Sequence, residues 1–475
     1  MRPLDHPLTS EQKARIPRLR SQLQQLGYSE EALCRLLELE ELPMAKLGIL
    51  PGLGWMVDRD QTPTATMAGL WFARRRLPRA QVEECLGSDL VGLCLELGLL
   101  EENQRGLKAR VDIYPVEQAM IVTDPALLPG GSQKGHVYQL GADSFSLLRL
   151  TPRKPVRSAL DLCTGSGVHA VLAGFHAERV VGVDLNPRAL AYSRFNAVLN
   201  GLSNCRFVES DLYQQVRGQS FDLITANPPF VATPDPSMAL HRTGGASGEL
   251  VSERLVRGLP ELLAANGTFA MILDYPVMRA GGYLERLQTW LGGQTGWGIA
   301  VLDRARYGLH HYIDRHITKN LPWPKFCAEY RDYLDSYAEQ GIEKICLGLV
   351  YIRRLPPGSP GWSVLSELPL LTRQSSARIE AWLDALAAAH DPAWPDGAWR
   401  PNLKPGVSLY TEHRNGHAFV VHDSGWPLMQ RLEPEQARFA ATLDGQTSVQ
   451  ELGRQYGPQL TEATLRLMHS QLTLA

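Results

Sequence analysis

Polar side chains follow three short apolar runs in the middle of this 475-residue chain, and their types suit ligand binding. The first run contains Asp161 and leads into Cys163-Thr164-Gly165-Ser166-Gly167. The second run ends at Asp184, and the third ends at Asn227-Pro228-Pro229-Phe230. Open α/β sheets bind their ligands at the carboxyl ends of the strands, so these groups are expected to share one site.

The elements that must position these residues can be read from the flanking sequence. Residues 159–162, 179–183 and 221–226 are apolar runs of strand length, and residues 168–173 have helical spacing directly after the glycine turn. A strand, a tight turn and a helix followed by further strands predict an α/β fold with a largely parallel sheet.

The glycine turn alone leaves a nicotinamide dehydrogenase open. Gly165-x-Gly167-x-x-Ala170 fits a dinucleotide-binding pattern, and Asp184 follows at roughly the expected 20 residues. Asp161, however, places a carboxylate where it would repel a pyrophosphate and attract the ammonium of an amino-acid-like ligand. Hydride transfer also has no use for Asn-Pro-Pro-Phe, although that sequence by itself could form an ordinary turn.

Five stretches in this order resemble motifs of class I S-adenosylmethionine (SAM)-dependent methyltransferases. They are residues 161–167, 183–187, 196–201, 209–212 and 227–230. The chain is most similar to the small-methyltransferase branch, which includes HemK/PrmC-like protein glutamine N5-methyltransferases and rRNA guanine-N2 or adenine-N6 methyltransferases. The resemblance covers roughly residues 130 to 355, and it implies a Rossmann-like methyltransferase core with SAM as cofactor.

The resemblance also implies roles for individual residues. Asp184 is expected to accept both ribose hydroxyls, and Asp161 to receive the ammonium of SAM. The expected catalytic residues are Asn227, Pro228, Pro229 and Phe230. The expected cofactor-binding residues are Asp161, Cys163, Thr164, Gly165, Ser166, Gly167, Asp184, Leu185, Asn186, Asp211, Leu212 and Asn227.

The chemistry of Asn-Pro-Pro-Phe agrees with methyl transfer to nitrogen. An amide or exocyclic amine is a poor nucleophile, so its N–H groups must be held by acceptors that aim its lone pair. The side-chain carbonyl of Asn227 and the backbone carbonyl of Pro228 are two such acceptors, and the prolines fix the backbone in advance. Phe230 offers a face on which a planar amide or base can stack. No general base is evident.

Composition excludes several other classes. The formal net charge is -2, so no overall polyelectrolyte partner is indicated, although a local basic patch remains open. The seven cysteines form no C-x-x-C pair, and His310, His311 and His316 have no neighbouring cysteine or spaced carboxylate, so no metal site is expected. Without an apolar leader or a run of about 18 apolar residues, a cytoplasmic protein without a membrane contact is expected.

The chain divides into three predicted parts. Residues 1–123 are expected to form a helical, winged-helix-like module that ends in a strand pair at 107–114 and 118–123, separated by Pro115. Within that module, the cluster Trp71–Arg79 could contact phosphates or an acidic protein, or could simply be a solvated helix end.

The methyltransferase domain is expected at residues 124–355, with an insertion around 307–341 that departs from the shorter family pattern. The Pro- and Gly-rich residues 356–370 read as a linker, and 371–475 as a small winged-helix-like module with a hairpin signal at Asn415-Gly416. The lead-in 124–157 provides no residue that matches a family motif.

The methyl acceptor stays open at this level. The flanking modules favour a macromolecule, either a protein glutamine or an RNA base, over a small molecule or peptide of a biosynthetic pathway. A non-catalytic SAM-binding protein is a further alternative. A loop at 235–248, with His241 and Arg242, is a possible substrate lid. Nothing in the sequence indicates an oligomeric state.

Overall fold

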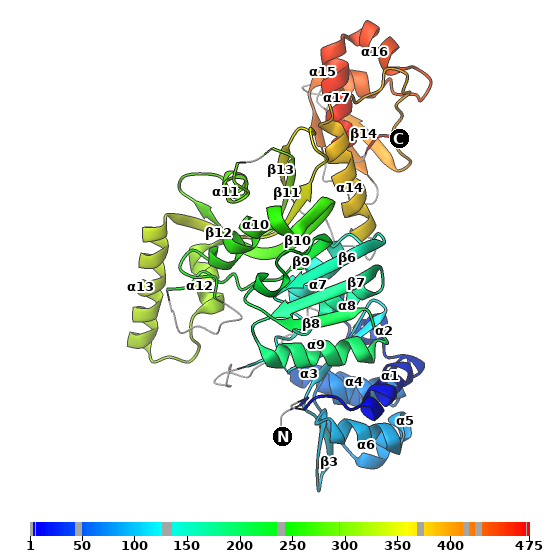
Figure 1. The fold of residues 1–475 in the computed structure, drawn as a ribbon, viewed down its shortest axis with the longest axis vertical. Helices are drawn as coiled ribbons and strands as arrows, with labels where there is room; N and C mark the ends of the chain where they lie inside the picture. Colours follow the sequence, from blue (N-terminus) through cyan, green and yellow to red (C-terminus); the bar gives the residue numbers. More distant parts are fainter. Residues whose placement is uncertain are drawn as a thin grey trace.

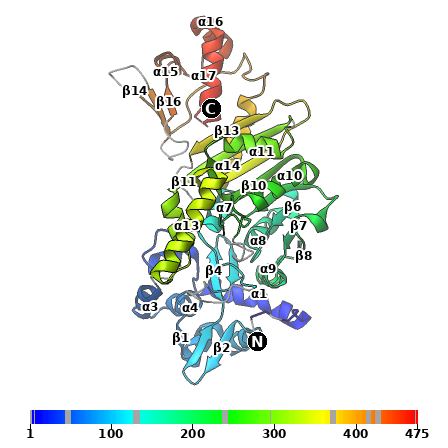
Figure 2. The same ribbon diagram turned by 90° about the vertical axis from the view of Figure 1, so that its left-hand side faces the viewer.

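The computed structural model describes residues 3–4, 6–42, 50–125, 135–234, 243–293, 295–367, 375–411, 418–422, 430–471 and 473–475. An eight-stranded sheet lies at its centre, with a helical module at each end of the molecule (Figure 1). The view turned by 90° shows the same arrangement, with the two terminal modules on opposite sides of the sheet (Figure 2).

The central sheet has the strand order β13-β11-β12-β10-β9-β6-β7-β8. All neighbouring strands run parallel except β12, which is antiparallel to both β10 and β11. This topology confirms the Rossmann-like core, and the strands expected at 159–162, 179–183 and 221–226 are present. The strands are β6 (Val156–Leu162), β7 (Ala177–Asp184), β8 (Cys205–Glu209), β9 (Phe221–Ala226), β10 (Leu263–Met278), β11 (Trp297–Gly308), β12 (Ile342–Arg354) and β13 (Trp362–Glu367).

Helices cover both faces of the sheet. The face formed by Leu160, Leu162 and Met271 packs against α10 (Leu250–Leu262) and α11 (Tyr283–Trp290). The opposite face carries Asp161 and Thr225 among its apolar residues, because successive residues of a strand point to opposite sides. Four helices cover that second face: α7 (Ala142–Leu150), α8 (Val168–Gly174), α9 (Pro187–Leu199) and α14 (Ser375–Ala389).

The N-terminal module has the order of elements found in winged-helix folds. A helix, a short strand and two helices are followed by a two-stranded wing, and the short strand joins the wing in the three-stranded sheet β1-β3-β2. The elements are α1 (Ser10–Gln25), α2 (Glu30–Leu36), α3 (Leu50–Asp58), α4 (Pro63–Trp71), β1 (Arg76–Leu77), α5 (Arg79–Leu86), α6 (Ser88–Glu96), β2 (Leu100–Asn103), β3 (Gly106–Ala109), β4 (Asp112–Val116) and β5 (Ala119–Thr123).

The strand pair expected at the end of this module differs in its first member. The run 107–114 is divided between β3, which joins the winged sheet, and β4, which pairs with β5 in a separate hairpin. Pro115 does not separate the two strands of the hairpin but lies within β4. A two-stranded hairpin leaves one side of each strand unpaired, so proline is accommodated there.

The arginine cluster after α4 is largely neutralised. Arg74 pairs with Asp112, and Arg75 with Asp58. Arg76 pairs with Glu101, while Arg79 pairs with Glu83 and Glu102. These ion pairs favour a structural role for the cluster over an open phosphate-binding patch.

Two asparagines of α9 join the N-terminal module to the core. The Asn196 side chain accepts a hydrogen bond from the Val122 amide and donates to the Val122 carbonyl, both at 2.9 Å. Asn200 makes the same pair of bonds with Met120, at 2.9 and 2.8 Å. The two side-chain amides therefore act as the missing neighbour of strand β5. Apolar side chains of α8 and α9 share one core with the N-terminal helices.

The insertion forms two helices between β11 and β12, α12 (Leu309–His316) and α13 (Trp323–Gln340). Helix α13 lies at the left-hand edge of the molecule in Figure 1 and faces the viewer in Figure 2.

The region read as a linker is partly sheet. Within 356–370, β13 pairs in parallel with β11 and extends the sheet by one strand. The C-terminal boundary expected at 371 also moves, because α14 places Ile379, Trp382, Leu383 and Leu386 on the central sheet. The boundary that fits the structure lies after α14.

The C-terminal module beyond α14 has its own core. Its strands β14 and β15 pair in antiparallel fashion, as the hairpin signal predicted, although Asn415 and Gly416 lie outside the described residues. The elements are β14 (Val407–Thr411), β15 (Ala418–His422), β16 (Gln430–Leu432), α15 (Pro434–Ala440), α16 (Val449–Tyr456) and α17 (Pro458–Ser470).

Candidate active site

The strand register brings the sequence-predicted residues to one edge of the sheet. Leu162 at the end of β6 is level with Val183 of β7 and with Ala226 of β9. The next residues along these strands are therefore neighbours, so Asp184 and Asn227 lie on either side of the glycine turn. This edge is the carboxyl end of the parallel strands, where ligands of such sheets bind.

The glycine turn after β6 has a backbone that most side chains would not allow. Cys163, Gly165 and Gly167 all have positive φ values, of 57°, 54° and 81°. A Cβ atom on Gly167 would approach Ser193 of α9 within 3.0 Å, whereas one on Gly165 would come no closer than 4.0 Å to any other atom. Gly167 is thus needed for packing. Gly165 presents an open backbone surface that a ligand can approach.

Asp184 is placed to bind a diol. Its Oδ2 accepts the Gly165 amide and its Oδ1 accepts the Asn186 amide, both at 2.8 Å. Each carboxylate oxygen has two lone pairs, so each keeps one for a further donor. Burial raises the pKa of this carboxyl above its ordinary value, and the two backbone amides oppose that rise. The arrangement fits the two ribose hydroxyls expected from the sequence.

Asp161, which is expected to receive the ammonium of SAM, accepts several hydrogen bonds from within the protein. Its side chain is 1% exposed and accepts hydrogen bonds from the Thr164 hydroxyl at 2.5 Å, the Thr225 hydroxyl at 2.8 Å and the Ala170 amide at 3.1 Å. Burial raises its pKa to about 6. These contacts join the turn to β9 and α8, so Asp161 is a residue that holds the site in shape.

The other expected cofactor residues fall into two groups. Thr164 and Ser166 are buried, and their side chains contact other parts of the protein. A ligand can therefore contact only the backbone of these two residues. Leu185 is 44% exposed beside Asp184, where an apolar side chain can contact a bound ligand. Asn186 caps α9 by accepting the Arg188 amide at 3.1 Å.

Asp211 and Leu212 follow β8 on the other side of Asp184. The Asp211 carboxylate accepts hydrogen bonds from the side chains of Arg254 at 2.8 Å and Gln214 at 3.2 Å. It therefore forms an ion pair at the surface of the site. Leu212 has a positive φ of 51° and is buried. The groups present along this edge therefore fit SAM: a carboxylate for the ribose, an open glycine backbone and an exposed leucine.

Asn227 is held by residues that the sequence did not indicate. Its side-chain nitrogen donates to Asp143 Oδ2 at 2.8 Å and lies 3.4 Å from the Ser144 hydroxyl, both in the first turn of α7. These contacts fix the orientation of the side-chain amide, with its nitrogen toward α7. Within the described part of the chain, the Asn227 carbonyl oxygen accepts no hydrogen bond. It remains available to a substrate N–H group.

The residues after Asn-Pro-Pro-Phe are fastened by the insertion. The Tyr337 hydroxyl donates to the Ala232 carbonyl at 2.8 Å, and the Thr233 hydroxyl donates to Tyr333 at 3.0 Å. Both tyrosines belong to α13 and are buried. Phe230 itself packs partly against the core beneath α10 and keeps part of its ring accessible. The insertion therefore supports the loop on which the predicted catalytic residues lie.

Sequence reasoning missed two carboxyl groups near Asn227. Asp143 lies 84 residues before Asn227 in the chain, and the sequence around α7 contains no motif that predicts the contact. Asp274 in β10 could have been found, because it follows the apolar run 269–273 as Asp184 follows its own run. Met271 is level with Ala226, so Asp274 lies three residues beyond the point where the pairing of β10 with β9 ends.

Three other expectations concern a lid, a metal site and a membrane span. His241 and Arg242 of the possible lid lie outside the described residues. Among the residues that are described, no cluster of His, Cys, Asp or Glu could hold a metal ion. His310 hydrogen-bonds with Tyr330 at 2.9 Å, and His311 stacks on Tyr307. The described helices include none that is both long and apolar enough to span a bilayer.

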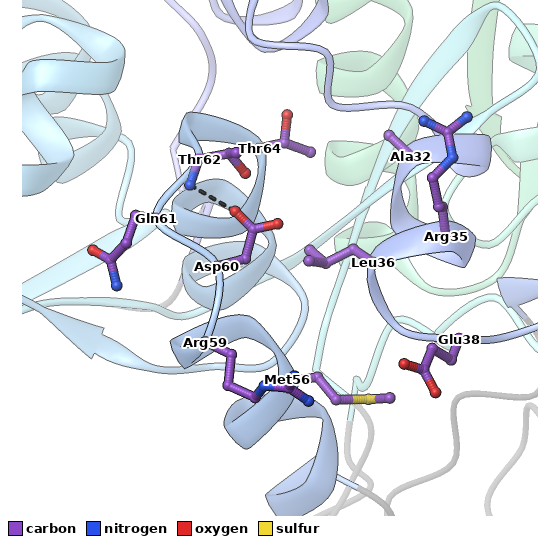
Figure 3. Close-up of a pocket in the computed structure, with 10 residues that line it drawn as sticks. All are labelled: Ala32, Arg35, Leu36, Glu38, Met56, Arg59, Asp60, Gln61, Thr62 and Thr64. Atoms are coloured by element: carbon purple, nitrogen blue, oxygen red, sulfur yellow. Dashed lines mark hydrogen bonds between the residues drawn. The ribbon is translucent and has the colours of Figure 1, made fainter.

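A cleft in the N-terminal module lies apart from the strand ends. Figure 3 shows it between α2, which contributes Arg35 and Leu36, and the end of α3, which contributes Met56. Asp60 in this cleft accepts the Thr62 amide at 2.7 Å, and Thr62 caps α4. The Asp60 carboxylate therefore stabilises the turn before α4. The cleft presents no set of groups suited to catalysis.

Comparison with known proteins agrees with the geometry of the strand ends. Residues 140–279 match the family model described as "Methyltransferase small domain". A protein of Methanocaldococcus jannaschii named "Putative protein N5-glutamine methyltransferase" is 32% identical over 142 residues, which are 29% of this chain and 71% of that relative. The chain belongs to the small-methyltransferase family. The matched segment of this methyltransferase contains the glycine turn, Asp184 and Asn227.

Two further relatives align over shorter parts of their length. The ribosomal protein uL3 glutamine methyltransferase of Francisella tularensis is 33% identical, over 24% of this chain and 40% of the relative. The release factor glutamine methyltransferase of Thermodesulfovibrio yellowstonii is 39% identical, over 16% of this chain and 29% of the relative. The chain thus spans less than half the length of these two relatives.

Proposed function

We propose that this chain transfers a methyl group from SAM to the side-chain amide nitrogen of a glutamine in a protein. The observation that carries the proposal is the fixed orientation of Asn227. Its amide nitrogen is held by Asp143 at 2.8 Å, and its carbonyl oxygen is left to accept a substrate N–H group. The names of the relatives support glutamine as the acceptor, because all three reported above are glutamine methyltransferases.

The residues of the chain would bind the donor and acceptor side by side. SAM, when bound, supplies a methyl group on a positively charged sulfur. Asp184 and the open backbone at Gly165 would hold its ribose and the adjoining part of the molecule. The Asn227 carbonyl and the Pro228 carbonyl would accept the two N–H groups of the glutamine amide.

Positioning explains how so poor a nucleophile can react. The lone pair of an amide nitrogen is delocalised into the carbonyl group. Acceptors on both N–H groups hold the nitrogen in place and favour the charge that develops as the new bond forms. Holding the two reactants in line removes most of the entropic cost of their encounter. Asp161 supports this arrangement from below by joining β6, β9 and α8.

The experiment uses the purified full chain, labelled SAM and two acceptors suggested by the relatives, a release factor and ribosomal protein uL3. Label should enter at least one of them on glutamine, as established by mass spectrometry of the peptides. Asn227→Ala should remove most of the turnover while SAM still binds, because the lost group contacts the acceptor.

The same reaction mixture with a fractionated cell lysate separates the alternatives. Label in the protein fraction supports the proposal. Label in RNA with none in protein would assign the exocyclic amine of a base instead, and label only in small molecules would assign a biosynthetic role. SAM binding without any label in these fractions would favour a non-catalytic binding protein.

A further inference from the structure

A buried carboxyl group lies next to the proposed acceptor site without an assigned task. Asp274 is 7% exposed and lies in β10 three residues beyond Met271, the last residue that pairs with β9. It points to the same face of the sheet as Ala270 and Ile272, since side chains alternate along a strand. Helix α7, which carries Asp143, covers that face.

The groups around Asp274 come from three elements, because Tyr337 of α13 also lies close enough to interact with it electrostatically. On α7 the Asp143 carboxylate lies close enough to interact with it electrostatically. On α12 the Tyr312 hydroxyl faces it, and the Arg315 guanidinium, 4.8 Å above the ring of Tyr307, adds a favourable charge. Within the described residues, Asp274 has no ion pair at contact distance. Tyr312 is fully buried, and its hydroxyl does not reach standard hydrogen-bond geometry with any group there.

A buried carboxyl group and a buried hydroxyl group that satisfy each other poorly are costly to fold. Such costs concentrate where a protein binds a ligand or performs chemistry. Burial raises the pKa of Asp274 to about 7, against the opposing effects of Arg315 and Tyr312 and with a further rise caused by Asp143. A carboxyl group with such a pKa can take up and release a proton near neutral pH.

We propose that Asp274 accepts the proton that the acceptor nitrogen loses when it is methylated, with Tyr312 and Arg315 of the insertion positioning and tuning it. The assignment rests on the proposed function. The nitrogen lone pair forms the new N–C bond while the sulfur–carbon bond breaks and its electron pair stays on sulfur. The nitrogen then carries a positive charge, and one of its N–H protons moves to an Asp274 carboxylate oxygen and from there to water.

The test follows the rate of methylation of the release factor and of uL3 as a function of pH, using the full chain. For the wild type, kcat/KM should rise with pH through about 7 and then level off, because only the ionised carboxylate can accept a proton. Asp274→Asn should bind SAM normally, lower kcat about a hundredfold or more and lose this dependence on pH.

Two milder variants decide the matter even if Asp274→Asn does not fold. Tyr312→Phe and Arg315→Gln each remove a group that lowers the pKa of Asp274, so each should move the rising limb to higher pH. Arg331→Gln is the matched control: it removes an exposed arginine of α13 and should leave the limb in place.

The outcomes separate this inference from the proposed function. If the wild type labels neither these acceptors nor any protein of the lysate on glutamine at any pH, the proposed function fails and the inference fails with it. If the wild type labels one of them, the proposed function stands. In that case a normal rate and pH profile in Asp274→Asn, or a limb that does not move in Tyr312→Phe and Arg315→Gln, would overturn the inference alone.

Discussion

The amide nitrogen of Asn227 donates a hydrogen bond to the carboxylate of Asp143 over a distance of 2.8 Å. This bond joins the strand that ends in Asn-Pro-Pro-Phe to the helix that precedes the first strand of the core. It holds the amide in the orientation that leaves the Asn227 carbonyl oxygen for a substrate donor. Asp143 is therefore a positioning residue for the proposed acceptor site.

Asp143→Asn should lower kcat at least tenfold with little change in SAM affinity. The new amide can rotate and donate a hydrogen bond to the Asn227 carbonyl, which then no longer serves the substrate. The double variant with Asn227→Ala should be about as slow as Asn227→Ala alone, because the two residues act as a unit. Additive losses in the double variant would argue against this coupling, and the exposed Asp332→Asn serves as the control.

Asp184→Ala should weaken SAM binding at least tenfold without unfolding the protein. The loss of hydrogen bonds to a charged group costs about 1.5–3 kcal/mol, and the side chain is only partly buried. Isothermal titration calorimetry measures the affinity, with Asp332→Ala as a variant of equal charge change. An unaltered dissociation constant would remove Asp184 from the cofactor site.

Asn196→Ala and Asn200→Ala form a matched pair that tests how the N-terminal module reaches the cofactor turn. Each removes the bonds to one residue of β5 and should lower the free energy of unfolding by about 1–3 kcal/mol. Asn196 alone also donates to the Ser166 carbonyl in the turn, at 2.8 Å. Only Asn196→Ala should weaken SAM binding as well, as denaturation curves and calorimetry can establish; equal SAM affinities would contradict the link.

The length of a C-terminal truncation should decide whether the core survives. A chain that ends after Asp391 keeps α14 on the sheet, and it should stay folded and bind SAM. A chain that ends at residue 374 exposes the sheet residues under Trp382 and Leu383, and burial of each such side chain contributes about 1.5–3 kcal/mol. It should aggregate. If the shorter chain were soluble with unchanged SAM affinity, α14 would be dispensable for the core.

The parts of the fold that were predictable are those with local signals. The strands that end at Leu162, Asp184 and Ala226 are dense apolar runs, and the turn between the first two is marked by its glycines. Strand β13 was missed because it is short and follows prolines and glycines that read as a linker. The packing of α14 on the central sheet was missed because the sequence of an amphipathic helix does not indicate which surface the helix covers.

Site residues could be predicted where a polar residue directly follows the apolar run of a strand. Asp184 and Asn227 follow such runs, and Asp274 could have been predicted in the same way. The contacts that Asp161 makes within the protein could not be read from the sequence, because only the folded chain brings Thr225 to it, 64 positions later. The bond between Asp143 and Asn227 spans 84 positions and depends on packing alone.

The core that the N-terminal helices share with α8 and α9 has a consequence during synthesis. Residues such as Leu19, Leu23 and Ile121 leave the ribosome well before Tyr192 and Leu199, against which this core is completed. The first module to emerge therefore exposes apolar surface until the chain has been extended through α9, at about 5–20 residues per second. For that interval we expect the nascent chain to be prone to aggregation.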